Sequence, residues 1–314
     1  MQKINLICIT GFANYVWEGL MLMLKPQGII TPIITPMYED ENINFEELRV
    51  QVNRLINSGI AGIFCLGTNG EVYALNTEEK LEVIKVVAGE AKGRVPVYAG
   101  TGCIRTKETI ELSLKAKELG VDALSIVSPY YVAVSQDDIY SCFSEIAEAV
   151  DLPIVLYNIP ARTGNNIDYK TVAKLAKYEN IVGIKDSSGN FDNTLRYIEN
   201  TDKRLSVLAG NDSLILWTLL AGGCGAIAGT SNVFPEIAVK IYKLWQAGNI
   251  EEAKAVQVSL RPFRDVMAMG NPNSVVKRAM NMMGYPVGPA RKPVSGLNSK
   301  AIDEALVKAL EFYK

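Results

Sequence analysis

Lys185 is the residue of this sequence best placed to act as a nucleophile. It follows the apolar run Ile181–Ile184, so its aliphatic stem is expected to be buried and its amine to end at the edge of a predicted strand. Burial disfavours the ammonium form, lowers the pKa of a lysine, and leaves a neutral amine that attacks ketones. The alternative interpretation is a lysine that pairs with a carboxylate or extends into solvent.

Proton transfer in this chain must rely on groups other than imidazole, because the 314 residues include no histidine. That absence excludes a Ser-His-Asp triad, a Cys-His pair and a histidine-ligated zinc. Tyr157 and Tyr131 are candidate proton shuttles near Lys185, and Thr68 could relay a proton between two phenols. Each of them alone also has a plainer interpretation, as a buried tyrosine with a satisfied hydroxyl or a threonine in a turn.

Two further features are suited to bind carboxylates. The glycine-flanked turn at 67–70, which contains Thr68 and Asn69, exposes backbone N–H groups. Arg162 carries a planar guanidinium that matches a carboxylate in shape and charge, although a solvated loop arginine is the alternative.

These side chains fall at the ends of short apolar segments that alternate with helical patterns. Strands are predicted over 28–36, 60–66, 95–99, 123–127, 153–158, 181–185, 205–210 and 225–228. Helices are predicted between them, for example after Asn44 and after Asn76, where a glutamate three residues later completes a capping-box pattern. Strands that are apolar throughout indicate burial on both faces, as in a parallel sheet covered by helices.

Eight such units predict an α/β fold, a (β/α)8 TIM barrel, with the functional residues at the carboxyl ends of the strands. An open doubly wound sheet is the alternative, but it requires a glycine-rich phosphate turn after the first strand, and residues 31–36 contain none. We expect an N-terminal extension of unknown role over 1–22, the barrel over 23–235, and a helical region packed on it over 236–314.

The composition excludes several classes of function. The 32 basic and 34 acidic residues give a net charge of −2 without a basic cluster, so no nucleic-acid partner is expected. Five scattered cysteines indicate reduced thiols rather than disulfides or a zinc site, which favours the cytoplasm. The first 24 residues lack the long apolar run of a signal peptide or membrane span, so no membrane association is expected.

Four motifs in order carry a resemblance to a known family: the turn 67–71 (GTNGE), 128–131 (SPYY), 157–164 (YNIPARTG) and 183–186 (GIKD). Together they resemble the dihydrodipicolinate synthase / N-acetylneuraminate lyase family of pyruvate-dependent class I aldolases. The resemblance extends from about Met23 into the C-terminal helices. It implies that Lys185 forms a Schiff base with pyruvate and that Tyr157 transfers protons at the imine.

The family also implies the remaining parts of the site and its assembly. Thr68 and Tyr131 would complete the proton relay, with Tyr131 supplied across the interface of a tight dimer within a homotetramer. Thr68 and Asn69 would hold the pyruvate carboxylate, and Gly210 and Ile227 would line the substrate pocket. Neither a metal nor an organic cofactor is implied.

The motifs allow three functions. Arg162 in its motif resembles the synthase branch, which implies condensation of pyruvate with L-aspartate 4-semialdehyde. The alternative is cleavage of a 2-keto-3-deoxy sugar acid or N-acetylneuraminate to pyruvate and an aldehyde. A non-catalytic keto-acid sensor is disfavoured because the lysine and all three relay residues are present.

Regulation by lysine is predicted to be weak or absent. In the family's lysine-sensitive members polar or imidazole groups line an allosteric pocket, and this chain has Val72, Lys80 and Ile104 at those places. Glu108 and Tyr130 match the family pattern.

Overall fold

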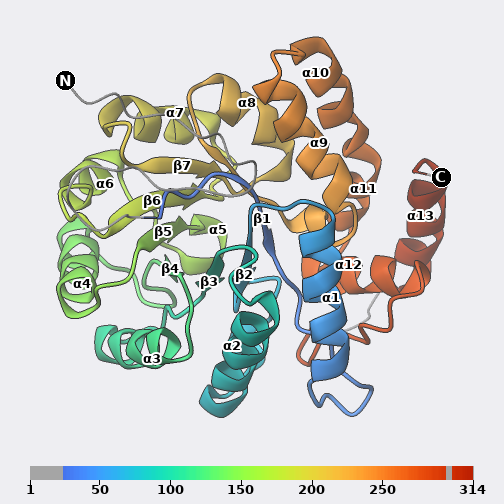
Figure 1. Ribbon diagram of the computed structural model, residues 1–314, viewed down its shortest axis with the longest axis horizontal. Coiled ribbons are helices and arrows are strands. Elements are labelled where there is room, and N and C mark those ends of the chain that lie inside the picture. The colour runs from blue at the N-terminus through green and yellow to red at the C-terminus, as the bar shows by residue number, and fades with distance from the viewer. Residues whose placement is uncertain (1–23, 295–298, 314) are drawn as a thin grey trace, which may run out of the picture.

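Eight parallel strands close into a barrel in the computed structural model of the chain, which describes residues 24–294 and 299–313. Each strand pairs with the next along the sequence, and β8 returns to pair with β1 (Figure 1). The closed barrel confirms the (β/α)8 prediction and rules out the open sheet. The strands are β1 Gly28–Pro32, β2 Gly62–Cys65, β3 Val97–Ala99, β4 Ala123–Val127, β5 Ile154–Asn158, β6 Ile181–Asp186, β7 Ser206–Ala209 and β8 Gly225–Ile227.

Helices surround the barrel on its outside (Figure 1). The outer helices are α1 Phe45–Asn57, α2 Thr77–Ala91, α3 Thr106–Glu118, α4 Gln136–Ala149, α6 Tyr169–Leu175, α7 Phe191–Asn200, α8 Ile215–Leu220 and α9 Pro235–Gln246. Four shorter helices follow the carboxyl ends of strands: η1 Val72–Ala74, α5 Pro160–Thr163, η2 Asp212–Leu214 and η3 Gly229–Asn232. These short helices were not predicted as separate elements, and they carry or flank much of the rim of the barrel.

The local signals in the sequence account for several helix ends. Asn76 and Glu79 form the reciprocal capping box predicted at the start of α2. Asn44 also caps α1 by accepting a hydrogen bond from the Glu47 N–H at 3.0 Å. The Glu47 carboxylate instead accepts from the Gln51 side chain, so the box predicted there forms only on one side.

The first predicted strand is longer than the observed one, which ends at Pro32. Beyond it, the Ile33 N–H still donates to the Phe64 carbonyl, and the Asn232 side chain bonds to the backbone on either side. It donates to the Pro32 carbonyl at 2.9 Å and accepts from the Ile34 N–H at 3.1 Å. The helix predicted over 212–221 is also divided, because the Asn211 side chain accepts from the Ser213 N–H and starts a tight 3-10 turn before α8.

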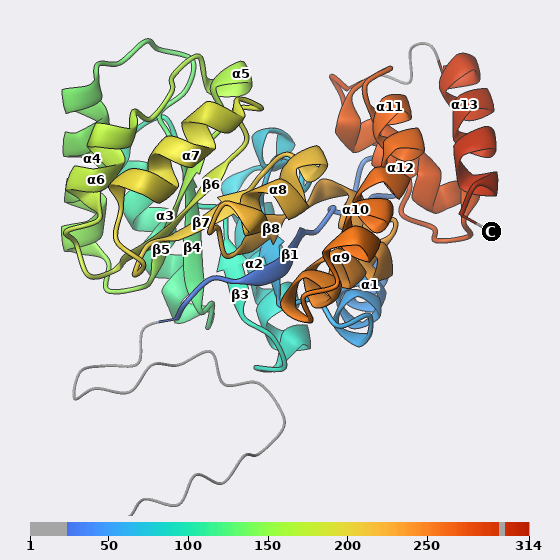
Figure 2. The same cartoon turned by 90° about the horizontal axis from the view of Figure 1, so that it is seen from above.

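Four helices complete the C-terminal region: α10 Ile250–Ser259, α11 Arg261–Met267, α12 Pro272–Met282 and α13 Ser299–Glu311. The last three share an apolar cluster that also includes Ile34 and Phe234, and they stand beside the barrel (Figure 2). No helix within the described ranges is both long and apolar enough to cross a membrane. The predicted extension over 1–22 lies outside the described residues.

Candidate active site

A cavity of about 280 Å³ opens at the carboxyl ends of the strands. It is the place at which a (β/α)8 barrel builds its active site. Seven of the eight predicted site residues line it: Thr68, Asn69, Tyr157, Arg162, Lys185, Gly210 and Ile227. Tyr131 is not among the lining residues.

Lys185 lies inside the mouth of the barrel as predicted. It precedes the last residue of β6 and is 5% exposed, so the side chain does not extend into solvent. Its Nζ lies 4.0 Å from the centre of the Tyr157 ring and 5.4 Å from that of Phe64. The adjacent carboxylate, Asp186, accepts hydrogen bonds from Asn158 and Thr194. The amine therefore faces aromatic rings and the cavity.

Tyr157 is the residue that links Lys185 to the turn after β2. Its hydroxyl lies 3.2 Å from Thr68 Oγ1, and its ring packs edge-on against Phe64. Burial alone would raise the pKa of this phenol. The positive charge of Lys185 and hydrogen bonds with Thr68, Lys185 and Ser187 outweigh burial, so the pKa lies below its ordinary value. A phenol of this kind gives and takes protons more readily than an isolated tyrosine.

Ser187 is a contact of Tyr157 that sequence reasoning missed, although it stands two residues after Lys185. Gly210 packs directly against it: a Cβ added at Gly210 would lie 2.0 Å from Ser187 Oγ. Only glycine fits between β7 and this serine.

The glycine-flanked turn brings Asn69 to the cavity, beside Gly229. A Cβ at Gly229 would lie 2.8 Å from Asn69 Nδ2, so the amide occupies the space that a side chain would take. Ile227, the last residue of β8, is buried and also lines the cavity. The amide and the backbone of this turn provide donors suited to a small carboxylate.

Arg162 stands at the rim on the single turn α5. Pro160 begins that turn and Gly164 ends it with a φ of +76°. The arrangement follows the usual preference for proline at the start and glycine after the end of a helix. Arg162 is exposed and lines the cavity, where its guanidinium is available to an anionic group.

Tyr131 stands on the loop between β4 and α4 and does not line the cavity. It is 92% exposed, with a φ of +74° that is unusual for a tyrosine. The buried Asn165 holds this loop, donating to the Pro129 and Val132 carbonyls at 2.9 Å each and accepting from the Val134 N–H. Sequence reasoning did not identify Asn165, because nothing in its motif indicates a contact with the preceding loop.

Residues of the C-terminal region also line the cavity, and none of them is among the predicted site residues. Arg264 and Met267 of α11 both reach it. Arg264 Nη2 donates to Asn211 Oδ1 at 2.8 Å, while its Nε is buried without a hydrogen-bond partner. Asp212 adds a buried carboxylate that accepts from the Gly229 and Thr230 N–H groups. Within the described residues, no cluster of three or more acidic or thiol side chains could hold a metal ion.

Comparison with known proteins places this geometry among characterised relatives. Residues 25–311 match the model of the dihydrodipicolinate synthetase family. A 4-hydroxy-tetrahydrodipicolinate synthase of Methanopyrus kandleri is 41% identical over 270 residues, which are 85% of this chain and 90% of that protein.

Solved structures agree with the sequence comparison. The structure of the 4-hydroxy-tetrahydrodipicolinate synthase from Methylacidiphilum fumariolicum superposes with a TM-score of 0.89 at 34% identity, covering 92% of this chain and 96% of that one. The chloride-inhibited dihydrodipicolinate synthase of Acinetobacter baumannii, complexed with pyruvate, gives a TM-score of 0.88 at 34% identity, covering 91% and 98%.

Proposed function

The chain belongs to the dihydrodipicolinate synthetase family, and on that premise we propose that it condenses pyruvate with L-aspartate 4-semialdehyde. This is the reaction of a 4-hydroxy-tetrahydrodipicolinate synthase in the diaminopimelate and lysine pathway. One observation carries the proposal: the Lys185 amine is buried against the Tyr157 phenol at the wall of a cavity whose rim presents Arg162.

In the first half of the reaction, Lys185 forms an imine with pyruvate. Its amine attacks the keto carbon of pyruvate, and loss of water leaves an imine. The pyruvate carboxylate is held at the turn by Thr68 and Asn69. Tyr157 supplies the proton that leaves with the water. The Tyr157 phenolate then takes a proton from the methyl group of the imine, which becomes an enamine, a carbon nucleophile.

In the second half, the semialdehyde binds at the rim of the cavity. Arg162 holds the carboxylate of the semialdehyde, so that the enamine carbon attacks its aldehyde carbon and forms the new C–C bond. The aldehyde oxygen takes the proton that Tyr157 removed from the methyl group, passed on through the relay, and becomes the hydroxyl group of the product. The substrate amine then attacks the imine carbon, closes the ring and displaces the Lys185 amine. One water is released overall, at the first imine step, and the lysine is regenerated.

A complete proton relay needs a second phenol, and we assign it to Tyr131 of a neighbouring subunit. The exposure of Tyr131 and the positive φ maintained by the Asn165 contacts favour a side chain presented to another protomer. The assembly we propose is a homotetramer built as a dimer of dimers. Tyr131 would cross the interface within each tight dimer.

The chemistry proposed here needs no metal or organic cofactor, because the protonated imine nitrogen itself accepts the electron pair. We also propose that the protein acts in the cytoplasm. Its four described cysteines, Cys65, Cys103, Cys142 and Cys224, are free thiols, as expected in a reducing compartment.

Reductive trapping tests the imine. Borohydride added to the enzyme with pyruvate should attach one reduced pyruvate to the peptide that contains Lys185. Lys185→Met should abolish the adduct, whereas a matched change at the exposed lysine of the α7–β7 loop, Lys203→Met, should not. An adduct at another peptide, or none, would contradict the proposal.

Steady-state turnover tests the second substrate. With pyruvate present, L-aspartate 4-semialdehyde should be consumed. A 2-keto-3-deoxy sugar acid or N-acetylneuraminate should not be cleaved to pyruvate at a comparable kcat/KM. The reverse preference would keep the imine chemistry and assign the enzyme to the lyase branch instead.

A further inference from the structure

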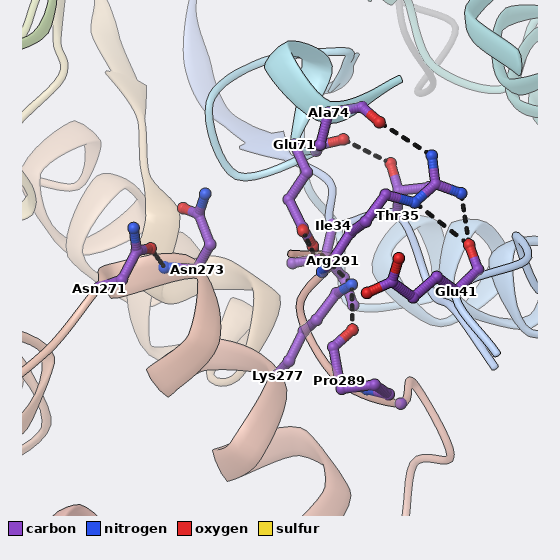
Figure 3. Close-up of polar contacts among 12 residues, drawn as sticks. Ile34, Thr35, Glu41, Glu71, Ala74, Asn271, Asn273, Lys277, Pro289 and Arg291 are labelled. Atoms are coloured by element: carbon purple, nitrogen blue, oxygen red, sulfur yellow. Dashed lines mark hydrogen bonds and ion pairs between the residues drawn. The ribbon is translucent and has the colours of Figure 1, made fainter. Parts of the chain in front are cut away.

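A fully buried ion pair lies outside the cavity, directly behind the turn that carries Thr68. Glu71 Oε1 is 2.5 Å from Lys277 Nζ, and the two side chains are 0% and 1% exposed (Figure 3). Glu71 closes the turn after β2, whereas Lys277 belongs to α12 of the C-terminal region. Desolvating two charges offsets much of their attraction, so a pair at this depth is poorly explained by stability alone.

Each charge of the pair has a further partner on the segment that follows α12. Lys277 Nζ donates to the Pro289 carbonyl at 2.8 Å, and Glu71 Oε2 accepts from the Arg291 N–H at 2.8 Å (Figure 3). The Arg291 side chain continues to the Ala74 carbonyl and to Glu79. The turn is therefore tied to both α12 and the segment that follows it.

The same face of α12 reaches Thr68 itself. Asn273, which is fully buried, donates from Nδ2 to the Thr68 carbonyl at 2.7 Å. The Glu71 N–H donates to that carbonyl at 3.1 Å. The backbone of Thr68 is thus bound from both sides, by the residue of the ion pair and by α12, while its hydroxyl faces Tyr157 at 3.2 Å.

The turn needs such contacts because regular strand pairing ends before it. β2 stops at Cys65, and the chain then passes through Leu66 and Glu71 with φ values of +58° and +56°. Left-handed conformations at non-glycine residues persist only where surrounding contacts fix them. The ion pair and Asn273 supply those contacts from a part of the chain about two hundred residues away.

We propose that Glu71, Lys277 and Asn273 are positioning residues that hold the Thr68 hydroxyl against Tyr157, which makes α12 part of the proton relay. The inference rests on the proposed function only for the roles of Lys185, Tyr157 and Thr68. Lys185 and Tyr157 stand on strands β6 and β5, and the hydrogen bonds of the Glu71 and Lys277 side chains go to Pro289 and Arg291 instead. Because the same turn holds the pyruvate carboxylate, loss of the pair should raise the pyruvate concentration needed to form the imine, but not the extent of imine formed at saturating pyruvate. Proton transfer after the imine depends on the pair directly.

Exchange of the pyruvate methyl protons with D2O isolates that step, because it requires the imine and the relay but no aldehyde. In Lys277→Met, borohydride trapping at saturating pyruvate should reach the wild-type extent. Exchange followed by NMR should slow at least about tenfold, because a relay group that is misplaced loses much of its contribution. Asn273→Ala should likewise keep wild-type trapping and slow the exchange, and it leaves no unpaired buried charge.

The matched control is the next residue on the same helix. Arg278 pairs with Asp303 of α13, away from the turn, so Arg278→Met also removes a cation of α12 from an ion pair. It should leave both trapping and exchange unchanged. Equal slowing in Arg278→Met and Lys277→Met would mean that the effect is general destabilisation of α12, and would overturn the proposal.

A double variant covers the case in which Lys277→Met does not fold. Glu71→Gln with Lys277→Met leaves no unpaired buried charge, and it should fold and trap pyruvate while its exchange stays slow. If the pyruvate methyl protons exchanged at the wild-type rate in both the double variant and Asn273→Ala, the positioning role would be refuted. Loss of trapping in the wild-type enzyme would instead refute the proposed function, so the two failures are distinguishable.

Discussion

Tyr157 and Lys185 are register partners on the neighbouring strands β5 and β6, and the lysine amine lies 4.0 Å from the centre of the tyrosine ring. Both side chains are therefore placed by the barrel itself rather than by a loop. The positive charge sits close enough to shift the ionisation of the phenol, and the phenol sits close enough to serve an imine formed on the amine.

Removing the Lys185 charge should raise the pKa of Tyr157. Burial raises the pKa of this phenol, and the lysine is the main opposing influence. In Lys185→Met, Thr68 and Ser187 remain, but burial prevails and the phenol should ionise above its ordinary value. Ultraviolet titration of phenolate measures this, with Tyr157→Phe identifying which transition belongs to Tyr157. An unchanged titration curve would show that the two groups are not coupled.

Gly210→Ala should damage both stability and turnover. The added methyl would lie 2.0 Å from Ser187 Oγ and 2.8 Å from the Asp186 carbonyl, which belongs to the backbone of β6. We expect a loss of about 1–3 kcal/mol in the free energy of unfolding and a lower kcat, because Ser187 is displaced from Tyr157.

The matched control for this substitution is Gly89→Ala in α2, where the new methyl would have no neighbour within 4 Å apart from the surrounding backbone of the helix itself. There we expect a gain of up to about 1 kcal/mol, from the higher helix propensity of alanine. Denaturant unfolding and steady-state kinetics on both variants decide the matter. If the two variants changed the free energy of unfolding and kcat equally, close packing at Gly210 would not explain the effect.

The sequence was sufficient to predict that Lys185 and Tyr157 meet, because consecutive strands of a parallel barrel end at the same rim. It did not predict that the two residues are register partners on neighbouring strands. The register between β5 and β6 shifts after Ile154, which pairs with Ile181 while Val155 pairs with Gly183. Without that shift Tyr157 would stand opposite Ile184, and no periodicity in these apolar runs reveals it.

The contribution of the C-terminal region could not be predicted for a different physical reason. Arg264, Asn273 and Lys277 contact residues far away in the sequence. Their positions on α11 and α12 look like ordinary polar helix positions. Only the packing of these helices against the rim, decided by a separate apolar cluster, directs them to the cavity and the turn.

Arg162→Ala should impair the second substrate and spare the first. Loss of a charge-assisted hydrogen bond to a carboxylate corresponds to about a 10–100-fold drop in kcat/KM for the semialdehyde. Pyruvate trapping should be unchanged. Arg264→Met should have a smaller effect of the same kind, because Asn211 already occupies one of its amino groups.

The control for both arginines is Arg261→Met, at an exposed position on the helix that carries Arg264. It should leave kcat/KM for both substrates at the wild-type value. If Arg162→Ala weakened pyruvate and the semialdehyde equally, Arg162 would not be the group that binds the second substrate.

Tyr131 can be tested by combining two inactive variants. Tyr131→Phe and Lys185→Met should each lose most activity on their own. If Tyr131 serves the neighbouring subunit, a mixed dimer contains one complete site, formed by Lys185 of one subunit and Tyr131 of the other. Random mixing should then restore about a quarter of wild-type turnover, since half of the dimers are mixed and each has one intact site. Full activity of Tyr131→Phe alone would place Tyr131 outside the relay, and inactive variants that do not recover on mixing would place it in the site of its own subunit.

Inhibition by L-lysine should be weak or absent. An amino-acid effector needs partners for its ammonium and carboxylate groups, and a site that leaves either of them unpaired binds poorly. Here Ile104 is an exposed apolar side chain, and the nearby Glu108 carboxylate already pairs with Arg105 at 2.9 Å. Turnover measured across a lysine titration checks this, with Arg105→Met as the variant that frees Glu108 and should increase sensitivity. Half-inhibition of the unmodified enzyme at sub-millimolar lysine would show that other groups complete the pocket.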